Sequence, residues 1–171
     1  METWDAIRAR RNVREFEDTA VSTDDLDRIL EAGRRAPSAK NTQPWDFVVV
    51  TDREQLERLS GVWQGAWHVA GAPAAIAFVM PRFETERQWN IAWFDLGHAV
   101  MSMMVMAADL GLGTGHASVM DQDLAREILG FPADRYCAML LSVGRPADRP
   151  IAPLNKPNRR PFDEVVHRER W

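Results

Sequence analysis

The sequence predicts a single domain of mixed α and β class, either α+β or α/β. The length of 171 residues suits one domain and would be cramped for two. Short runs of β-prone residues alternate along the chain with longer segments of helical periodicity. No repeat and no low-complexity linker interrupts this order, so one domain is expected to span residues 1–171.

Helical periodicity accounts for most of the chain outside three short apolar runs. Leu26, Ile29 and Leu30 recur at helical spacing after a run of capping and acidic residues that begins at Ser22. Asp52 and Asp121 are suitable N-caps for two shorter helices. The expected helices cover residues 2–9, 22–35, 52–59, 88–110 and 121–129.

Three buried strands are expected between these helices. The clearest contains Phe47 to Val50, a continuous run of β-prone residues. The expected strands cover residues 45–51, 74–80 and 138–143. Composition predicts loops at residues 36–44, where two prolines restrict the backbone, and at the glycine-rich residues 111–115.

The expected helix over residues 88–110 is apolar on nearly all sides, so it must be buried on several of them. In a chain of this size, that requirement predicts a partner subunit that covers part of the helix. Its most apolar stretch, residues 99–108, is about half the ~20 residues needed to cross a bilayer. We therefore expect no membrane span.

A cytoplasmic location is expected from the N-terminus and from cysteine usage. The first residues lack the apolar stretch of a signal peptide. Cys137 is the single cysteine, which rules out an internal disulfide and suits a reducing compartment. It lies in an apolar run and is interpreted as a buried core thiol.

The distribution of charge points to a local anion rather than a long polyanion. The formal net charge of -4 does not favour binding to nucleic acid. Two basic clusters, at residues 10–14 and 156–160, nevertheless stand out near the two ends. Arginines that converge there could clamp a phosphate through forked, permanently charged donors. The alternative is a solvated charged loop.

The predicted loop at residues 36–44 could contact a planar heteroaromatic ligand. Ser38, Asn41, Thr42 and Gln43 offer short hydrogen-bonding side chains close to Trp45. An ordinary turn into the following strand is the alternative.

Two tryptophan pairs, Trp63 with Trp67 and Trp89 with Trp93, have a spacing of four residues. Such rings could stack on a flat substrate, although core packing or a dimer interface is favoured.

No metal site or nucleophilic site is expected. The four histidines lack the spacing of metal ligands, and no paired nucleophile and base are visible. His98 is interpreted as an interior histidine, whereas His116 could face a bound ligand. The glycines at 111–115 follow a helix rather than a strand, which excludes a dinucleotide-binding fingerprint.

Four segments together resemble the flavin-dependent nitroreductase family. Residues 10–16, RRNVREF, resemble its R-R-S-x-R-x-F opening, and residues 36–45, APSAKNTQPW, resemble its A-P-S-x-x-N-x-Q-P-W loop. Residues 95–113 resemble its central dimerisation helix, and residues 143–146 with 159–166 resemble its closing strand and tail. The order of the four segments is that of the family.

This resemblance implies an α+β, three-layer fold with a central, mostly antiparallel sheet flanked by helices. It also implies an intertwined homodimer with two FMN sites at the subunit interface, and NADH or NADPH as the electron donor. The implied FMN-binding residues are Arg10, Arg11, Asn12, Arg14, Pro37, Ser38, Ala39, Asn41, His116, Ser118, Arg159 and Arg160.

The resemblance also divides these residues by role. Arg10, Arg11 and Asn12 would hold the phosphate and ribityl region, and Arg14 would approach the N1/O2 edge of the ring. Pro37, Ser38, Ala39 and Asn41 would come from the partner subunit. His116 and Ser118 would lie beside the ring, and Arg159, with Arg160 or Lys156, would complete the phosphate clamp.

The hypothesis that follows is a ping-pong cycle, in which NAD(P)H reduces the flavin and a nitroaromatic or quinone then reoxidises it. Flavin reduction, enone reduction and dehalogenation on the same fold remain alternatives. A flavin-binding regulatory protein without turnover is another.

Overall fold

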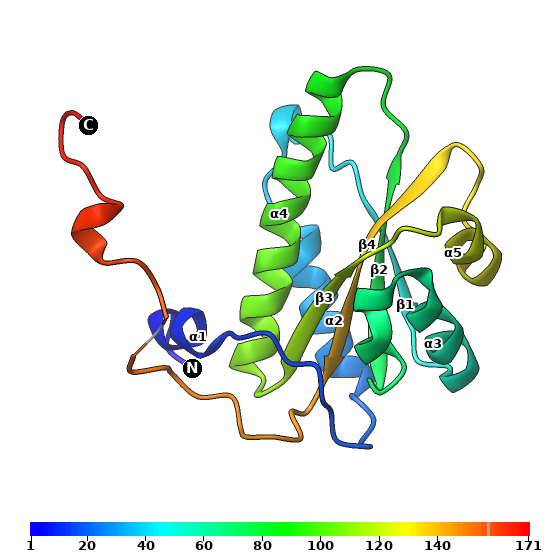
Figure 1. Cartoon of the computed structure of the whole chain (residues 1–171), viewed down its shortest axis with the longest axis horizontal. Helices are drawn as coiled ribbons and strands as arrows, with labels where there is room; N and C mark the ends of the chain where they lie inside the picture. The colour runs from blue at the N-terminus through cyan, green and yellow to red at the C-terminus, as the bar shows by residue number, and fades with distance from the viewer. Residues whose placement is uncertain (157) are drawn as a thin grey trace.

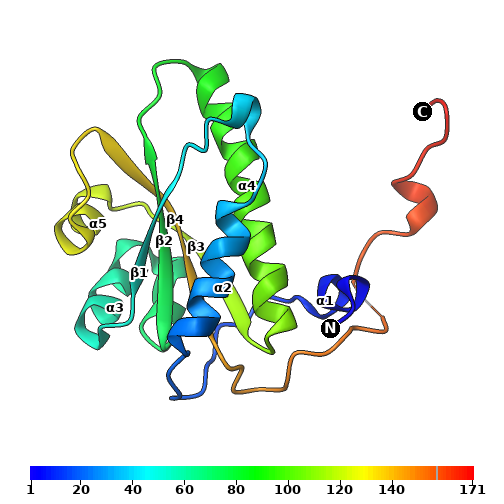
Figure 2. The same cartoon turned by 180° about the vertical axis from the view of Figure 1, so that it is seen from behind.

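The computed structural model describes residues 1–156 and 158–171, and it contains one four-stranded antiparallel sheet between two layers of helices (Figures 1 and 2). The strand order is β1-β2-β4-β3. The α-helices are α1 (Thr3–Ala9), α2 (Thr23–Arg34), α3 (Arg53–Leu59), α4 (Glu86–Asp109) and α5 (Gln122–Leu129). The strands are β1 (Asp46–Val50), β2 (Ala74–Pro81), β3 (Gly113–Ser118) and β4 (Arg135–Gly144). The α+β class and the three layers are as the sequence and the resemblance predict.

Alternation along β2 produces a separate core on each face of the sheet. Ile76 and Phe78 pack on one side beneath α2 and α4, while Ala75 and Ala77 face α3, α5 and two short 3₁₀ helices. These 3₁₀ helices are η2 (Ser60–Val62) and η3 (Gln64–Val69). Every residue from Ala74 to Met80 is buried, which explains why this strand appears in the sequence as a continuous apolar run.

Helix α4 is the central helix of the fold. A capping box between Thr85 and Gln88 fixes its start, and Leu96 and Met103 are buried against the sheet and α2. By length and composition it could span a membrane, but half of its most apolar window is buried inside the protein. Its other face remains open, with Phe94 69% exposed and Met101 41% exposed.

The glycine-rich segment after α4 becomes strand β3 at Gly113, so the expectation of a loop at residues 111–115 was right for residues 111–112 and wrong for residues 113–115. Residues from Gly113 to Ser118 pair antiparallel with β4, in a register that places Gly113 opposite Gly144. Glycine has a low intrinsic preference for strands. The segment is a strand because β4 supplies backbone hydrogen bonds along its whole length. Strand β4 is also longer than expected, because it runs from Arg135 to Gly144.

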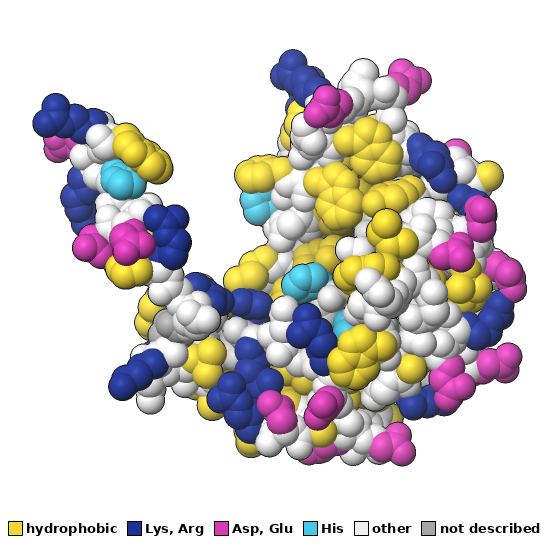
Figure 3. Space-filling view, viewed as in Figure 1, with side chains coloured by type: hydrophobic (Ala, Val, Ile, Leu, Met, Phe, Trp, Pro, Cys, Tyr) yellow, Lys and Arg dark blue, Asp and Glu magenta, His cyan; other side chains and the backbone are white. Residues whose placement is uncertain are grey.

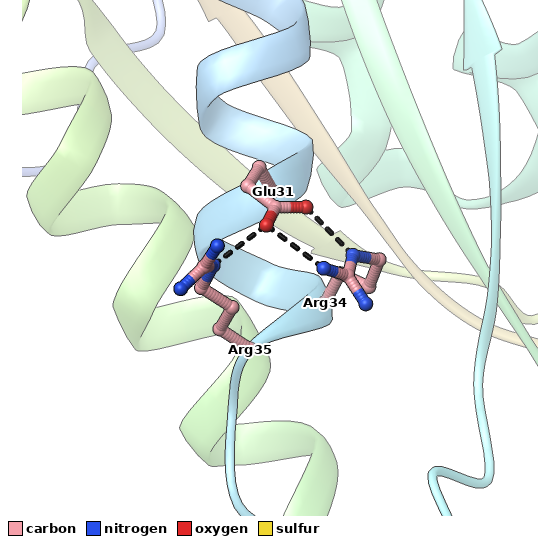
Figure 4. Close-up of polar contacts among 3 residues, drawn as sticks. All are labelled: Glu31, Arg34 and Arg35. Atoms are coloured by element: carbon pink, nitrogen blue, oxygen red, sulfur yellow. Dashed lines mark hydrogen bonds and ion pairs between the residues drawn. The ribbon is translucent and has the colours of Figure 1, made fainter.

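The arginines at the end of α2 are paired within that helix. Glu31 accepts hydrogen bonds from Nε of Arg34 and Nε of Arg35, both at 2.6 Å (Figure 4). These bonds lower the pKa of the exposed Glu31 carboxyl to about 2. The two arginines are therefore held at the last turn of α2 and belong to neither basic cluster.

The C-terminal segment leaves the body of the molecule. Ile151 is buried and Leu154 donates its backbone N–H to the carbonyl of Arg8, whereas residues 158–171 extend away as an arm that carries the short 3₁₀ helix η4 (Phe162–Glu164) (Figures 1 and 2). Figure 3 shows Lys and Arg side chains gathered where this arm joins the body.

Substituting Gly115 tests how closely the N-terminal segment packs on β3. A Cβ at Gly115 would lie 2.3 Å from the backbone oxygen of Val13. We expect Gly115→Ala to lower the free energy of unfolding by about 1–3 kcal/mol, measured by urea denaturation. The control Gly71→Ala places its Cβ no closer than 3.9 Å to another atom, so it should stay within about 1 kcal/mol of wild type. Equal losses in both variants would contradict this packing.

Candidate functional site

The basic segment at residues 10–14 lies in extended conformation along β3. Val13 donates its N–H to the carbonyl of Thr114 at 2.8 Å, and Asn12 forms a parallel bridge with the same residue. Because side chains alternate along extended backbone, Arg10, Asn12 and Arg14 face one way and Val13 faces the other. Val13 is buried, and Asn12 and Arg14 are exposed.

Arg14 borders a hollow of about 530 Å³ at the edge of β3. His116 and Ser118 line it from the strand, where they point outward on either side of the buried Ala117. Trp63 and Trp67 form the opposite wall. The structure therefore brings together three of the residues implied by the resemblance and adds two tryptophans to them.

For the pair Trp63 and Trp67, the sequence favoured core packing or a dimer interface, and the expectation of core packing was wrong. Trp63 has extended backbone, with φ of -168°, and Trp67 lies in η3, so the two do not share the face of an α-helix. The ring of Trp63 covers Gly65, where an added Cβ would lie 2.0 Å from it. Trp67 is 54% exposed, so the pair forms an open aromatic wall rather than core.

The other pair, Trp89 and Trp93, has a packing role, as the sequence favoured. Both rings meet Tyr136 edge to face, with centroid distances of 5.2 Å and 6.3 Å. Trp89 also donates its Nε1–H to the carbonyl of Phe83.

Arg10 carries a donor without an acceptor. Its Nε is buried and has no hydrogen-bond partner among the described residues. A buried guanidinium donor left unpaired is costly, and an oxyanion of a bound ligand would satisfy it. Arg10 and Arg14 both lower the pKa of His116, after burial as the first cause, so this imidazole is neutral at neutral pH. The charge that remains beside the hollow is positive and suits an anionic group.

Arg11, like Arg10, does not line the hollow itself, and one nitrogen of its guanidinium is paired with the C-terminal side of the chain. Its guanidinium donates to Oδ1 of Asp148 at 2.6 Å and to the carbonyl of Arg149 at 2.8 Å. Alternation along the extended segment explains this pairing, because Arg11 points to the side opposite Arg10 and Asn12.

The loop between α2 and β1 is strained and rigidly held. Lys40, Asn41 and Gln43 have φ values of 54°, 56° and 47°, in the left-handed region that non-glycine residues rarely adopt. Ser38 Oγ accepts the N–H of Gln43 at 2.9 Å. The buried carboxylate of Asp95, on α4, accepts the N–H of Ala39 at 2.9 Å.

Within one chain, this loop is separate from the Arg14 hollow. Ala39 lines a different cavity of about 640 Å³, together with Trp45, Arg135 and the first half of α4. Pro37 lines a third hollow, of about 600 Å³, between α1 and α4.

The C-terminal cations are not brought to the Arg10 segment in this chain. Arg160 pairs with Glu164 at 3.4 Å, and Arg159 donates to the carbonyl of Asn158 at 2.7 Å. Both lie on the extended arm, and Lys156 is exposed next to the segment that contacts Arg8.

Behind the hollow, His68 joins three elements through a buried hydrogen-bond chain. Its Nδ1 lies 2.8 Å from Oγ of Ser142 on β4, and that hydroxyl donates to the carbonyl of Gly115 at 3.0 Å. Because the hydroxyl proton goes to Gly115, Nδ1 of His68 must carry the other proton. Sequence reasoning missed this role, since nothing in the local sequence distinguishes His68 from a packing residue.

The single cysteine is a core thiol rather than a reactive one. Cys137 is buried, as expected, and burial raises the pKa of its thiol to about 12. Across residues 1–156 and 158–171, no three metal-ligating side chains converge.

Known proteins match this chain along most of its length. The sequence profile described as the Nitroreductase family matches residues 7–82 and 63–145. A protein of Archaeoglobus fulgidus, whose name joins NADH dehydrogenase with NAD(P)H nitroreductase, is 30% identical over 169 residues, which are 96% of each chain. An FMN reductase of Bacillus subtilis is 28% identical over 94% of this chain and 71% of its own. The solved FMN-dependent nitroreductase of Clostridium difficile superposes with a TM-score of 0.82 and 26% identity, over 97% of this chain and 98% of that one.

The buried His68 predicts a loss of stability in mild acid. Burial, followed by the charge of Arg14, lowers the pKa of His68 below its ordinary value of 6.5. The unfolded chain therefore binds more protons than the folded one below about pH 6.5, so stability falls as the pH decreases, by at most about 1.4 kcal/mol per pH unit for one proton. We expect the free energy of unfolding, measured by urea denaturation between about pH 7 and pH 5, to fall less steeply in His68→Gln than in wild type.

His116 contributes in the same direction, so the slope should decrease in His68→Gln without disappearing. The control His167→Gln changes an exposed histidine of the arm and should leave the slope unchanged. A His68→Gln slope as steep as that of wild type would show that His68 does not titrate on unfolding.

Proposed function

The chain belongs to the nitroreductase family and is an NAD(P)H-dependent flavin oxidoreductase, and we propose that it reduces nitroaromatic or quinone-type acceptors. The observation that carries the site assignment is the aromatic hollow lined by Arg14 and His116, together with the buried, unpartnered Nε of Arg10, which lies near enough to lower the pKa of His116. A cofactor with a phosphate and a flat ring satisfies both features.

Arg10 and Asn12 would hold the FMN phosphate and ribityl region. They lie on the same face of the extended segment, and the unpaired Nε of Arg10 needs an oxyanion. Arg11 would join them at the phosphate, because Asp148 and Arg149 engage only its Nη2 and leave Nη1 and Nε to donate.

Arg14 would set the electrostatics of the ring. Bound FMN supplies two-electron chemistry, accepting a hydride from NAD(P)H and passing it to the acceptor. A fixed cation near N1 and O2 favours the reduced, anionic flavin. The neutral His116 and the hydroxyl of Ser118 would offer polar contacts along the ring edge without adding charge.

Trp63 and Trp67 would form the aromatic side of the acceptor site. Their exposed rings border the same hollow as Arg14, and flat acceptors gain stacking contacts there. Such a wall also excludes water from the reacting face. This wall would favour acceptors that are planar and aromatic.

A homodimer would complete each site. Trp4 and Ile7 on α1, with Phe94 and Met101 on α4, leave an exposed apolar surface that a second copy could cover. Pro37, Ser38, Ala39 and Asn41 would then reach the partner's flavin, as the family resemblance implies. Arg159, with Arg160 or Lys156, would reach the phosphate once the arm is docked. We further propose a cytoplasmic protein that binds neither nucleic acid nor membrane.

The visible spectrum of the purified protein tests this function directly. We expect a flavin spectrum after FMN addition, bleaching with NADH or NADPH under anaerobic conditions, and recovery with nitroaromatic or quinone acceptors. Enones, halo-aromatics and free flavin, assayed in parallel, would identify the alternative chemistries. Protein that stays colourless after FMN addition would overturn the proposal, and a bound flavin that neither nucleotide reduces would indicate a non-catalytic binding protein.

Arg10 and Arg14 should have separable effects. Arg10→Ala removes a charged phosphate donor and should weaken FMN binding about 10- to 100-fold. Arg14→Ala should bind FMN with an affinity closer to that of wild type than Arg10→Ala does. The bound flavin should have a lower midpoint potential and should be reduced more slowly by NAD(P)H. FMN titration and spectroelectrochemistry measure the two effects, with Arg28→Ala on the exposed face of α2 as the control. Equal release of FMN by both variants would contradict this division of roles.

A further inference from the structure

The hollow beside Arg14 has two walls that come from different parts of the fold. Strand β3 supplies His116 and Ser118, and Arg14 lies beside them; we name this side the strand wall. Trp63, just before η3, and Trp67, within η3, form the other side, which we name the tryptophan wall. Walls from two separate segments keep a fixed spacing only where the surrounding structure holds them together.

The buried side chain of His68 joins these two walls. His68 directly follows Trp67 in η3 and is fully buried. Its ring meets the Trp67 ring edge to face, with the centroids 6.0 Å apart. On its other side, Nδ1 lies 2.8 Å from Oγ of Ser142, and that hydroxyl donates to the carbonyl of Gly115 at 3.0 Å. A continuous chain of contacts therefore runs from the tryptophan wall to the strand wall.

Gly115 is the point where this chain meets the basic segment. A Cβ added there would lie 2.3 Å from the carbonyl oxygen of Val13 and 3.2 Å from Cε1 of His68. The N-terminal segment, β3 and η3 thus converge on one α-carbon. The residues that follow in the chain, Arg14 and His116, both line the hollow. A shift of the backbone at Gly115 would consequently move the strand wall.

Packing alone does not explain an imidazole at position 68. Its Nε2 is buried and has no hydrogen-bond partner among the described residues. Such an atom costs free energy, and an apolar ring would fill the same space without that cost. Burial, followed by the charge of Arg14, lowers the pKa of His68, so the neutral ring adds no charge to the site. What the imidazole supplies is a directed hydrogen bond from Nδ1 to Ser142.

We propose that His68 is a positioning residue that fixes, through Ser142, the spacing between the tryptophan wall and the strand wall, and thereby the fit of a planar acceptor. The proposal rests on the proposed function for the acceptor, whereas the bond between the walls belongs to the chain itself. Loss of the bond should loosen the hollow and weaken the stacking of a flat ring. FMN binding should change less, because Arg10 and Arg11 would hold the phosphate from another segment.

The chain offers variants that break this bond from either end. His68→Phe keeps a ring and removes the Nδ1 donor, and Ser142→Ala removes the bridging hydroxyl should His68→Phe fail to fold. His68→Asn is the conservative variant, because its side-chain amide can donate in place of Nδ1. Ser60→Ala is the control, since that hydroxyl donates to the carbonyl of Glu57 at 2.7 Å and does not line the hollow.

The first readout is the environment of Trp67 in the protein without FMN. The chain is labelled with fluorotryptophan, and the fluorine NMR signal of Trp67 is assigned with Trp67→Phe. We expect this signal to shift and broaden in Ser142→Ala, which does not alter the neighbouring ring, while the signals of Trp89 and Trp93 stay in place. Ser60→Ala should give the wild-type spectrum.

The second readout is the kinetics of the FMN-loaded enzyme with menadione, a planar quinone. We expect His68→Phe and Ser142→Ala to raise the KM for menadione about 3- to 10-fold, which corresponds to the loss of stacking contacts. Both kcat and the dissociation constant of FMN should stay within about twofold of wild type. His68→Asn should recover part of the effect, and Ser60→Ala should behave as wild type.

Two results would overturn the inference. One is a Trp67 signal in Ser142→Ala that is identical to that of wild type, because the bond would then not hold the tryptophan wall. The other is an unchanged KM for menadione in both His68→Phe and Ser142→Ala, because the bond would then not set the fit of the acceptor. A wild-type chain that binds no FMN would instead overturn the proposed function, and the Trp67 signal would still decide whether His68 joins the walls.

Discussion

The candidate site depends on one backbone contact, the docking of residues 10–14 onto the edge strand β3. The bond from Val13 to Thr114 holds the segment extended, and Gly113 and Gly115 allow it to approach closely because a Cβ at either would collide with Val13. Extended backbone then sorts the side chains by alternation. The separation of Arg10 and Arg14 from Arg11 follows from this geometry rather than from any difference in residue type.

At the candidate site, the charges of Arg10 and Arg14 are not neutralised by acidic partners among the described residues. Acidic partners occupy Arg11, Arg34 and Arg35, whereas Arg10 retains a buried donor with no acceptor among the described residues. The two neighbouring histidines are kept neutral by burial and by the arginine field. Positive charge is thus concentrated on fixed guanidinium groups, which suits an anionic cofactor whose charge increases near its ring on reduction.

A single chain contains two separate parts of the FMN site that the family resemblance implies, which are the basic segment with its hollow and the loop at residues 38–43. The loop at residues 38–43 is strained, and the buried carboxylate of Asp95 holds its first turn against α4. Strain of this kind persists only where the surrounding structure fixes it, and it is concentrated at functional sites. The open apolar face of α4 lies on the same helix that supports this loop. A second copy on that face would therefore place a rigid loop, rather than a mobile one, beside the partner's site.

The sequence by itself determined the mixed α and β class, the apolar central helix, the buried strands at residues 74–80 and 138–143, and the two basic clusters, because periodicity and composition are local properties. Helical spacing favoured packing for both tryptophan pairs alike, which holds for Trp89 and Trp93 and fails for Trp63 and Trp67. Only the tertiary structure decided that Gly113–Ser118 is a strand, since β4 supplies the hydrogen bonds that glycine-rich sequence does not predict. It likewise decided that Trp63 and Trp67 face Arg14, that His68 links η3 to β3 and β4, and that Arg11 faces Asp148. These pairings join residues that lie far apart in the chain, and no local pattern encodes which distant partner a side chain will meet.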